Sequence, residues 1–198
     1  MKFTAFGLSI PVCIIFAVSA PAQETKEAAV TTAAFEQLKS LAGKWEGKTQ
    51  DDKPAGLTYE VVSHGTAVME HLMPGRESDM VTIYTLEGDR IVVTHYCSAG
   101  NQPTMQTEPL RGALGKYDFS FVRVAGTKTP DEGHMVSLSL ALSDKDHLTQ
   151  VWTFDDHGKS VVETIHFTRK KIVRRLSQRS VPGIFAPRGR TSAWRTRS

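Results

Sequence analysis

The feature that most constrains the fold is a succession of short segments, from Leu57 to Thr168, in which apolar and polar residues alternate. A period of two is typical of strands that bury one face. Turn signals such as Pro74-Gly75, Gly88-Asp89 and Asp156-His157-Gly158 separate these segments at the spacing of hairpins. The predicted strands include residues 57–62, 80–86, 90–96, 117–122, 134–142, 148–154 and 160–168.

A single short helix is expected ahead of these strands. In the segment Thr31–Leu41, Phe35 and Leu38 recur on one face, and Gly43 follows as a helix-ending residue. No helical pattern alternates with the strands, which disfavours a parallel sheet. We therefore predict an all-β fold, an antiparallel β-barrel of about nine or ten strands with a short N-terminal helix, because closure leaves no exposed strand edge.

The alternation also predicts which side chains face the interior of this barrel. A two-residue turn at Gly88-Asp89 fixes the register of one hairpin. The predicted pairs are Glu87 with Arg90, Tyr84 with Val93, Thr82 with His95, and Met80 with Cys97. The predicted inward-facing residues of two strands are Tyr84, Val93, His95 and Cys97 for this hairpin and His134, Val136, Leu138, Leu140 and Leu142 for a later strand.

The N-terminus has the pattern of a secretory signal peptide. Lys2 provides a positive charge, residues 6–18 are apolar, and Ala20-Pro21-Ala22 provides a small-residue cleavage site. The apolar run is too short to span a bilayer, and no later segment predicts a membrane span. We expect a secreted or periplasmic protein. Its expected parts are a signal peptide (1–22), a flexible segment (23–34), the barrel (35–170) and a basic tail (171–198).

The C-terminal tail differs in charge from the rest of the chain. From Arg169 onward there are ten basic residues and no acidic ones, so all 21 acidic residues precede it. Such a tail can bind nucleic acid or an anionic envelope surface, be a disordered appendage, or be an extension without a role. We favour an unstructured tail without a nucleic-acid partner, because exported proteins seldom meet nucleic acid.

The junction of helix and first strand carries a family resemblance. Gly43, Trp45 and Gly47 resemble the Gly-x-Trp entrance of lipocalins and their calycin relatives, in which the tryptophan packs across the closed end of the barrel. Residues 63–105 resemble a group of exported bacterial lipocalin-like domains of unknown function. The likeness covers about residues 35–170 and implies the fold, but it brings no established chemistry.

The same Gly-x-Trp-x-Gly start is similar, more distantly, to nitrobindins, which are haem-binding barrels. The resemblance places Glu163, and not a histidine, near the position of the haem ligand. His166 is the candidate haem ligand, but it lies three residues further on and so on the opposite face of a regular strand. No two of the seven histidines have the spacing of a zinc site, so we predict no metal site.

Removal of the signal peptide leaves Cys97 as the sole cysteine, which excludes an internal disulfide. His95 lies two residues away, so the two can form a nucleophile and base, with Asn101 helping to stabilise an oxyanion. Alternatively, Cys97 is a small buried side chain and His95 lines the barrel. We favour the second interpretation, so a catalytic role for His95 and Cys97 stays the alternative.

Glu70 is in phase with Val68 and Leu72, so it faces the interior if they do. A carboxylate buried there must be hydrogen-bonded or have a raised pKa, and His95 and Tyr84 are its expected partners. The other interpretation places Glu70 on the outer face, in solvent, and the sequence does not decide between them.

The leading functional hypothesis is an exported barrel that binds a small, largely apolar ligand, since a few polar groups in an apolar concavity are typical of such sites. The alternatives are a hydrolase or redox enzyme that uses Cys97 and His95, and a haem carrier. The predicted ligand-binding residues are Trp45, Glu70, Tyr84, Val93, His95, Cys97, Asn101 and Met105.

Overall fold

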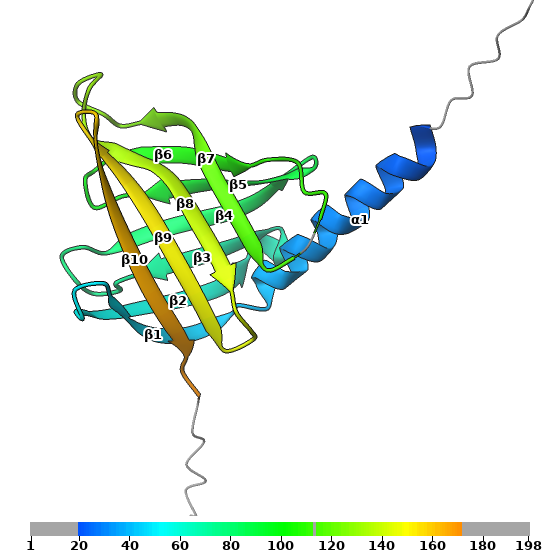
Figure 1. Ribbon diagram of the computed structural model, residues 1–198, viewed down its shortest axis with the longest axis horizontal. Helices are drawn as coiled ribbons and strands as arrows, with labels where there is room; N and C mark the ends of the chain where they lie inside the picture. The colour runs from blue at the N-terminus through cyan, green and yellow to red at the C-terminus, as the bar shows by residue number, and fades with distance from the viewer. Residues whose placement is uncertain (1–19, 113, 172–198) are drawn as a thin grey trace, which may run out of the picture.

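The computed structural model describes residues 20–112 and 114–171. Ten strands form a closed antiparallel barrel, in which each strand pairs with its neighbours in the chain and β1 closes against β10 (Figure 1). The predicted fold class is confirmed. The elements are α1 (Ala20–Lys39), β1 (Gly43–Thr49), β2 (Pro54–Val62), the 3-10 turn η1 (Ser63–Gly65), β3 (Ala67–Leu72), β4 (Met80–Glu87), β5 (Arg90–Tyr96), β6 (Gln102–Thr107), β7 (Lys116–Ala125), β8 (His134–Leu142), β9 (His147–Asp156) and β10 (Lys159–Arg169).

The helix α1 begins at Ala20, well before the predicted start at Thr31. It therefore also covers residues 23–34, for which we expected a flexible segment. The prediction followed the apolar stripe, which begins near Phe35, whereas the preceding residues have no such stripe but are rich in alanine, glutamate, glutamine and lysine. These residue types have high intrinsic helix propensity and extend a helix without packing.

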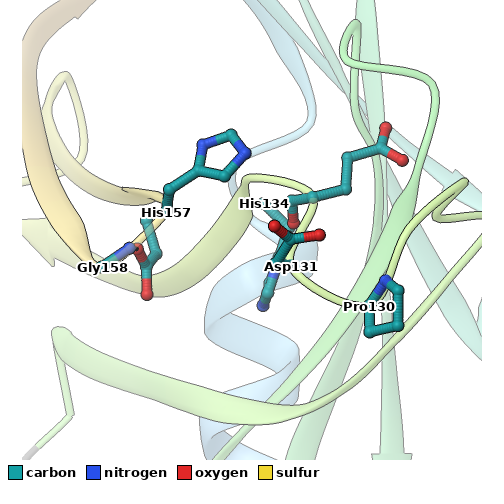
Figure 2. Close-up of a pocket in the computed structure, with 7 residues that line it drawn as sticks. Pro130, Asp131, His134, His157 and Gly158 are labelled. Carbon is teal, nitrogen blue, oxygen red and sulfur yellow. Dashed lines mark hydrogen bonds between the residues drawn. The ribbon is translucent and has the colours of Figure 1, made fainter.

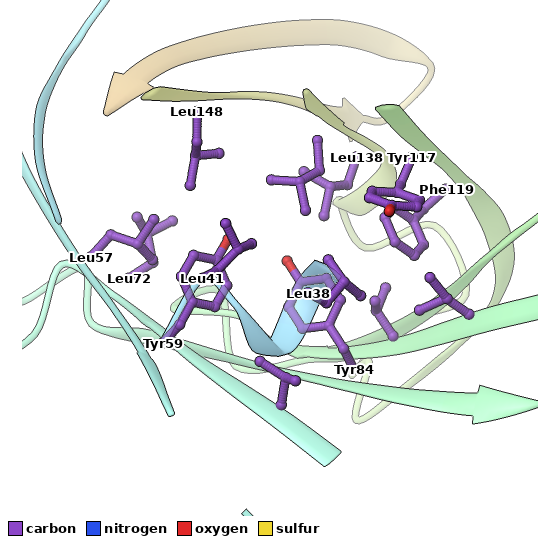
Figure 3. Packing of buried hydrophobic residues seen from close by; sticks show 14 of the residues in the cluster. Leu38, Leu41, Leu57, Tyr59, Leu72, Tyr84, Tyr117, Phe119, Leu138 and Leu148 are labelled. Atoms are coloured by element: carbon purple, nitrogen blue, oxygen red, sulfur yellow. The ribbon is translucent and has the colours of Figure 1, made fainter. Parts of the chain in front are cut away.

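The C-terminal half of α1 closes one end of the barrel, and its N-terminal half stands away from it (Figure 1). Leu38 and Leu41 are buried between Tyr59 and Leu57 on one side and Tyr117 on the other (Figure 3). We call this the closed end. The opposite end, where β5 joins β6, β7 joins β8 and β9 joins β10, is called the mouth.

Trp45 and Arg169 fasten the end of α1 to the barrel. The indole Nε1 of Trp45 donates a hydrogen bond of 2.9 Å to the carbonyl oxygen of Leu41. The Arg169 guanidinium lies 4.2 Å from the centre of the Trp45 ring and donates to the carbonyl oxygens of Ser40 and Ala42. These carbonyls at the helix end have no partner within the helix, so a cation there satisfies them and favours the helix dipole. Trp45 thus closes the barrel end, as the resemblance implied.

The last glycine of the Gly-x-Trp-x-Gly start, Gly47, is required by the close packing of β1 against β10. A Cβ atom at this position would collide with the backbone of His166 and the ring of Phe167 on β10. The absence of a side chain therefore lets β1 approach β10 closely enough to close the barrel.

The predicted register of the β4–β5 hairpin is confirmed for three pairs: Glu87 with Arg90, Tyr84 with Val93, and Thr82 with His95. The fourth pair is not formed, because β5 ends at Tyr96 and Cys97 begins a turn. In this turn the Cys97 N–H donates to the carbonyl oxygen of Asn101.

Two details of the sheet differ from the expected pattern. The register of β8 shifts between Met135 and Ser137, so Val136 is a bulge and Met135, not His134, packs against the core. Pro103, a residue type that usually interrupts the pairing of a strand, lies inside β6 opposite Val124. It lies beyond the three residue pairs that join β6 to β5, so its missing N–H breaks no bond of that ladder.

Most of the predicted signal peptide and the predicted basic tail, from residue 172 onward, lie outside the described residues. Within the part of the chain that is described, no helix combines the length and apolar character needed to cross a membrane.

Candidate functional site

The inward-facing side chains of several strands are buried at the closed end and become exposed toward the mouth. On β10, Phe167 and Ile165 are buried, Glu163 is half-buried and Val161 is 50% exposed, although all four lie on one face. On β7, Phe119 is buried whereas Phe121 is 40% exposed. Solvent therefore reaches the inner surface of the barrel from the mouth.

The same trend appears on neighbouring strands, where the inward-facing residue nearest the mouth is only half-buried. Most of these residues are apolar, so the inner surface at the mouth is mainly apolar. We define the mouth lining as Met80, Cys97, Phe121, Met135, Phe154, Val161 and Glu163.

Beneath the mouth lies a hydrogen-bonded network centred on Glu70, which is fully buried. Its Oε2 atom accepts hydrogen bonds from the hydroxyls of Tyr59 (2.7 Å) and Tyr84 (2.6 Å) and from Nε2 of Gln150 (2.8 Å). Trp152 Nε1 in turn donates to Oε1 of Gln150. The interior placement of Glu70 is thus the one the structure supports.

Burial dominates the ionisation of this network. Desolvation raises the pKa of Glu70, although the hydrogen bonds from Tyr84, Tyr59, Gln150 and Thr82 oppose the rise. Burial first, and the neighbouring Glu70 carboxylate second, raise the pKa values of Tyr59 and Tyr84 well above the ordinary value. Both tyrosines therefore stay protonated and act as donors to Glu70.

Thr82 connects this network to His95. Its hydroxyl donates to Oε1 of Glu70 (3.4 Å) and lies 2.9 Å from Nδ1 of His95. We assign the Thr82 proton to the hydrogen bond with Glu70, and with this assignment the Thr82 oxygen accepts from the Nδ1–H of His95. The Nε2 atom of His95 then carries a lone pair, and the tautomer is set by the hydrogen bond on the other nitrogen.

His95 is held in the interior as a neutral side chain. It is completely buried, and its ring centre lies 4.6 Å from that of Trp152. Burial lowers the pKa of His95 from 6.5 to about 4. The imidazole is therefore uncharged at neutral pH and can accept a hydrogen bond through Nε2.

This shift predicts a specific loss of stability in acid. Below pH 6.5 the unfolded chain binds a proton at His95 that the folded chain binds only near pH 4, so the stabilising contribution is lost as the pH falls through this window. When the pH is lowered from 7 to 4.5, the unfolding free energy of the wild type should fall by about 2–3 kcal/mol more than that of His95→Gln. Urea unfolding at the two pH values measures the difference. His166→Gln, on the outer face, keeps His95 and should retain the full acid loss, and equal losses in all three proteins would contradict the assignment.

Three buried polar atoms near the mouth have no hydrogen-bond partner among the described residues. They are Nε2 of His95, Oδ1 of Asn101 and Oε1 of Glu163. Glu163 pairs in register with Trp152 across β9 and β10, and the Trp152 ring contacts His95. A fourth such atom is the hydroxyl oxygen of Thr104. Thr104 pairs with Thr94, which lies between the inward-facing residues of β5 and so on the other face of the sheet. A buried polar atom without a partner is costly, which makes these positions candidates for ligand contacts.

Asn101 joins the edge of the mouth to the segment between β7 and β8. Its Nδ2 atom donates to the carbonyl oxygen of Gly133 (2.9 Å), and the Phe154 ring packs closely against that glycine. A neighbouring pocket of about 200 Å³ separates this segment from the β9–β10 turn (Figure 2). It is lined by three acidic residues and two histidines, Asp131, Glu132, His134, Asp155 and His157, together with Pro130 and Gly158.

The structure places the predicted site residues in three parts of the barrel: the interior, the mouth and the closed end. Glu70, Tyr84, Val93, His95 and Met105 are buried in the interior, which the strand pattern predicted for Tyr84, Val93 and His95, and Asn101 is buried at the mouth. Trp45 lies at the closed end, which removes it from a site at the mouth. Cys97 is half-buried in the mouth lining. His95 contacts Thr82 and Trp152, and its pairing with Cys97 as a base stays a prediction.

His166 is not a haem ligand inside the barrel. It is exposed on the outer face of β10, where its Nδ1 lies 3.0 Å from the hydroxyl of Thr149. Glu163 lies on the inward face of β10, opposite to His166, as expected for two residues three positions apart on a strand. Within the described residues, no group of three or more histidine, cysteine or acidic side chains is arranged to hold a metal ion.

Sequence reasoning missed three members of the interior network: Tyr59, Gln150 and Trp152. A signal for them was present, since Tyr59 is in phase with the buried Leu57, and Gln150 is in phase with the buried Leu148. A polar residue in phase with apolar positions indicates a buried polar group, which must have a partner.

Comparison with known proteins supports the fold. The crystal structure of Rv2717c from M. tuberculosis matches at 11% sequence identity with a TM-score of 0.52, over 70% of this chain and 98% of that chain. A protein of unknown function from the DUF3598 family of Nostoc punctiforme matches at 16% identity with a TM-score of 0.45, over 68% of this chain and 49% of that one. The sequence matches no protein-family model and no curated protein. At these identities the first likeness concerns the fold alone.

Proposed function

We propose that this chain is an exported, lipocalin-like barrel that binds a small, largely apolar ligand in its mouth. The observation that carries the proposal is the set of buried, unpartnered atoms of His95, Asn101 and Glu163 beneath an apolar, partly exposed lining. Apolar walls with a few converging polar groups provide affinity and orientation respectively. Export by residues 1–22 is part of the proposal and rests on the sequence pattern.

The network around Glu70 supports such a site from below. Glu70 directs its oxygens to protein donors, so it is not available to a ligand, but through Thr82 it fixes the orientation of His95. A binding group whose orientation is fixed before the ligand arrives loses less entropy on binding. Glu70 is therefore a positioning residue in this proposal, and His95 Nε2 is the contact.

A pair of adjacent valines on β10 tests the proposal. Val161 faces the mouth and Val162 faces outward, yet they are similarly exposed, at 50% and 47%. Val161→Asp places a charge on the apolar lining, so we expect it to weaken binding of the uncharged, polarity-sensitive dye prodan by about tenfold or more. Val162→Asp adds the same charge outside and should bind prodan like the wild type. Fluorescence titration measures both.

Native mass spectrometry of the purified protein provides a second measurement. We expect an adduct that is released on denaturation and is depleted in Val161→Asp but not in Val162→Asp. Equal prodan binding by both variants and the absence of any adduct would together refute a ligand site in the mouth.

A further inference from the structure

We infer that the mouth selects organic cations, specifically small amphiphiles with a protonated amine and an apolar body. This inference rests on the proposed function and defines the chemical class of the ligand. Its basis is that the polar groups presented to the ligand are acceptors, and that one of them is a carboxylate.

The hydrogen-bonding capacity of each group follows from its other contacts. Asn101 uses its NH₂ group to donate to Gly133, which leaves its Oδ1 as an acceptor. His95 has its Nδ1–H directed to Thr82, which leaves Nε2 as an acceptor. Glu163 presents a carboxylate oxygen, which accepts when it is ionised. Asn101 and His95 are fully buried, so these unpartnered atoms belong to a built site and not to a solvated surface. A ligand that satisfies the three atoms must supply hydrogen-bond donors.

A protonated amine matches this arrangement better than a neutral donor. An ammonium group has three donors and no acceptor, and a charge-assisted hydrogen bond to a carboxylate is roughly twice as strong as a neutral one. Trp152 lies opposite Glu163 in the β9–β10 ladder and beside His95. The face of a tryptophan ring attracts a cation, so the indole adds to the preference for positive charge.

The connections around the mouth carry charge of the matching sign. Residues 126–133 and 155–159 contain four carboxylates and two lysines. Asp131, Glu132 and Asp155 line the pocket beside the mouth (Figure 2). A negative potential at the entrance raises the local concentration of cations and accelerates their association. The same potential, together with Glu163, opposes entry of a carboxylate such as a fatty acid.

The position of the apolar lining determines where the apolar body of the ligand lies. Phe121, Phe154 and Val161 surround the entrance, between solvent and the polar floor. A ligand with its ammonium at Glu163 would therefore direct its apolar body along these side chains and toward solvent, which suits an alkyl or aryl amine.

Three eight-carbon probes that differ only in head group test the inference by isothermal titration calorimetry: octylammonium, octanol and octanoate. We expect the wild type to bind octylammonium at least about tenfold more tightly than octanol, and octanoate most weakly. Glu163→Gln removes the charge while keeping the shape, so it should weaken octylammonium binding by about tenfold and change octanol binding by less than about twofold. Glu87→Gln, an exposed position at the closed end, is the matched control and should change neither.

The outcomes separate this inference from the proposed function. If octylammonium and octanol bind equally, and Val161→Asp still abolishes prodan binding, the mouth is a ligand site without cation selectivity and the inference is wrong. If octanoate binds most tightly, the inference is also wrong. If none of the probes binds and prodan does not bind, the proposed function fails first.

Discussion

Glu70→Ala is expected to lower the free energy of unfolding by about 4 kcal/mol. The substitution removes the acceptor of the Tyr59 and Tyr84 hydroxyls and leaves these two donors buried without a partner, whereas Gln150 loses one bond and keeps its 3.0 Å hydrogen bond to the Tyr59 oxygen. Each unsatisfied donor costs about 1–3 kcal/mol, partly offset because a buried carboxylate no longer has to be desolvated. Urea unfolding at pH 7, followed by circular dichroism, measures the change.

Glu60→Ala is the matched control for this experiment. Glu60 lies next to Tyr59 on β2 but is exposed on the outer face, so its removal should change the unfolding free energy by less than about 0.5 kcal/mol. Glu70→Gln keeps an acceptor oxygen and should fall between the two. A loss below about 1 kcal/mol in Glu70→Ala would mean that the tyrosines find other partners and that the network is not a structural centre.

Trp45→Ala should lower the unfolding free energy by about 3–5 kcal/mol, the usual range for removal of a buried tryptophan. The indole fills the closed end, donates to Leu41 and provides the surface on which the Arg169 guanidinium lies. Its loss therefore leaves a cavity and also weakens the attachment of α1. Thermal and urea unfolding measure the effect.

The neighbouring substitution Lys44→Ala removes an exposed side chain from the same strand and should have little effect. Because Trp45 is at the end opposite the mouth, prodan binding by Trp45→Ala at a temperature where it is folded should equal that of the wild type. A large loss of dye binding in the folded variant would contradict the separation of the two ends.

The parts of the fold that were predictable are those coded by local patterns. The Gly88-Asp89 turn set the β4–β5 register, and the period of two then placed Tyr84, Val93 and His95 inside. The same period predicted that Glu163 and His166 lie on opposite faces of β10. The Gly-x-Trp-x-Gly start implied a tryptophan at the closed end, where Trp45 lies.

The remaining features depend on contacts that a local pattern does not contain. Met135 faces the core because Val136 bulges, and one extra residue reverses the alternation without an obvious signature. The partners of Glu70 come from β2, β4 and β9, so Gln150 reaches it only once distant strands are neighbours. Strand periodicity predicts that a side chain faces inward, but not which inward-facing side chains converge.

The pairing of the first strand with the last has a consequence for how the chain acquires its shape. Trp45 lies opposite Arg169 at the seam, so these two residues meet only after nearly the whole described chain has been synthesised. Until then β1 and the newest strand each present an unpaired edge, and the contact that fastens α1 has not formed. Folding dominated by such distant pairings is slow, so a nascent chain of this protein remains open, and dependent on protection from aggregation, until its final strand is available.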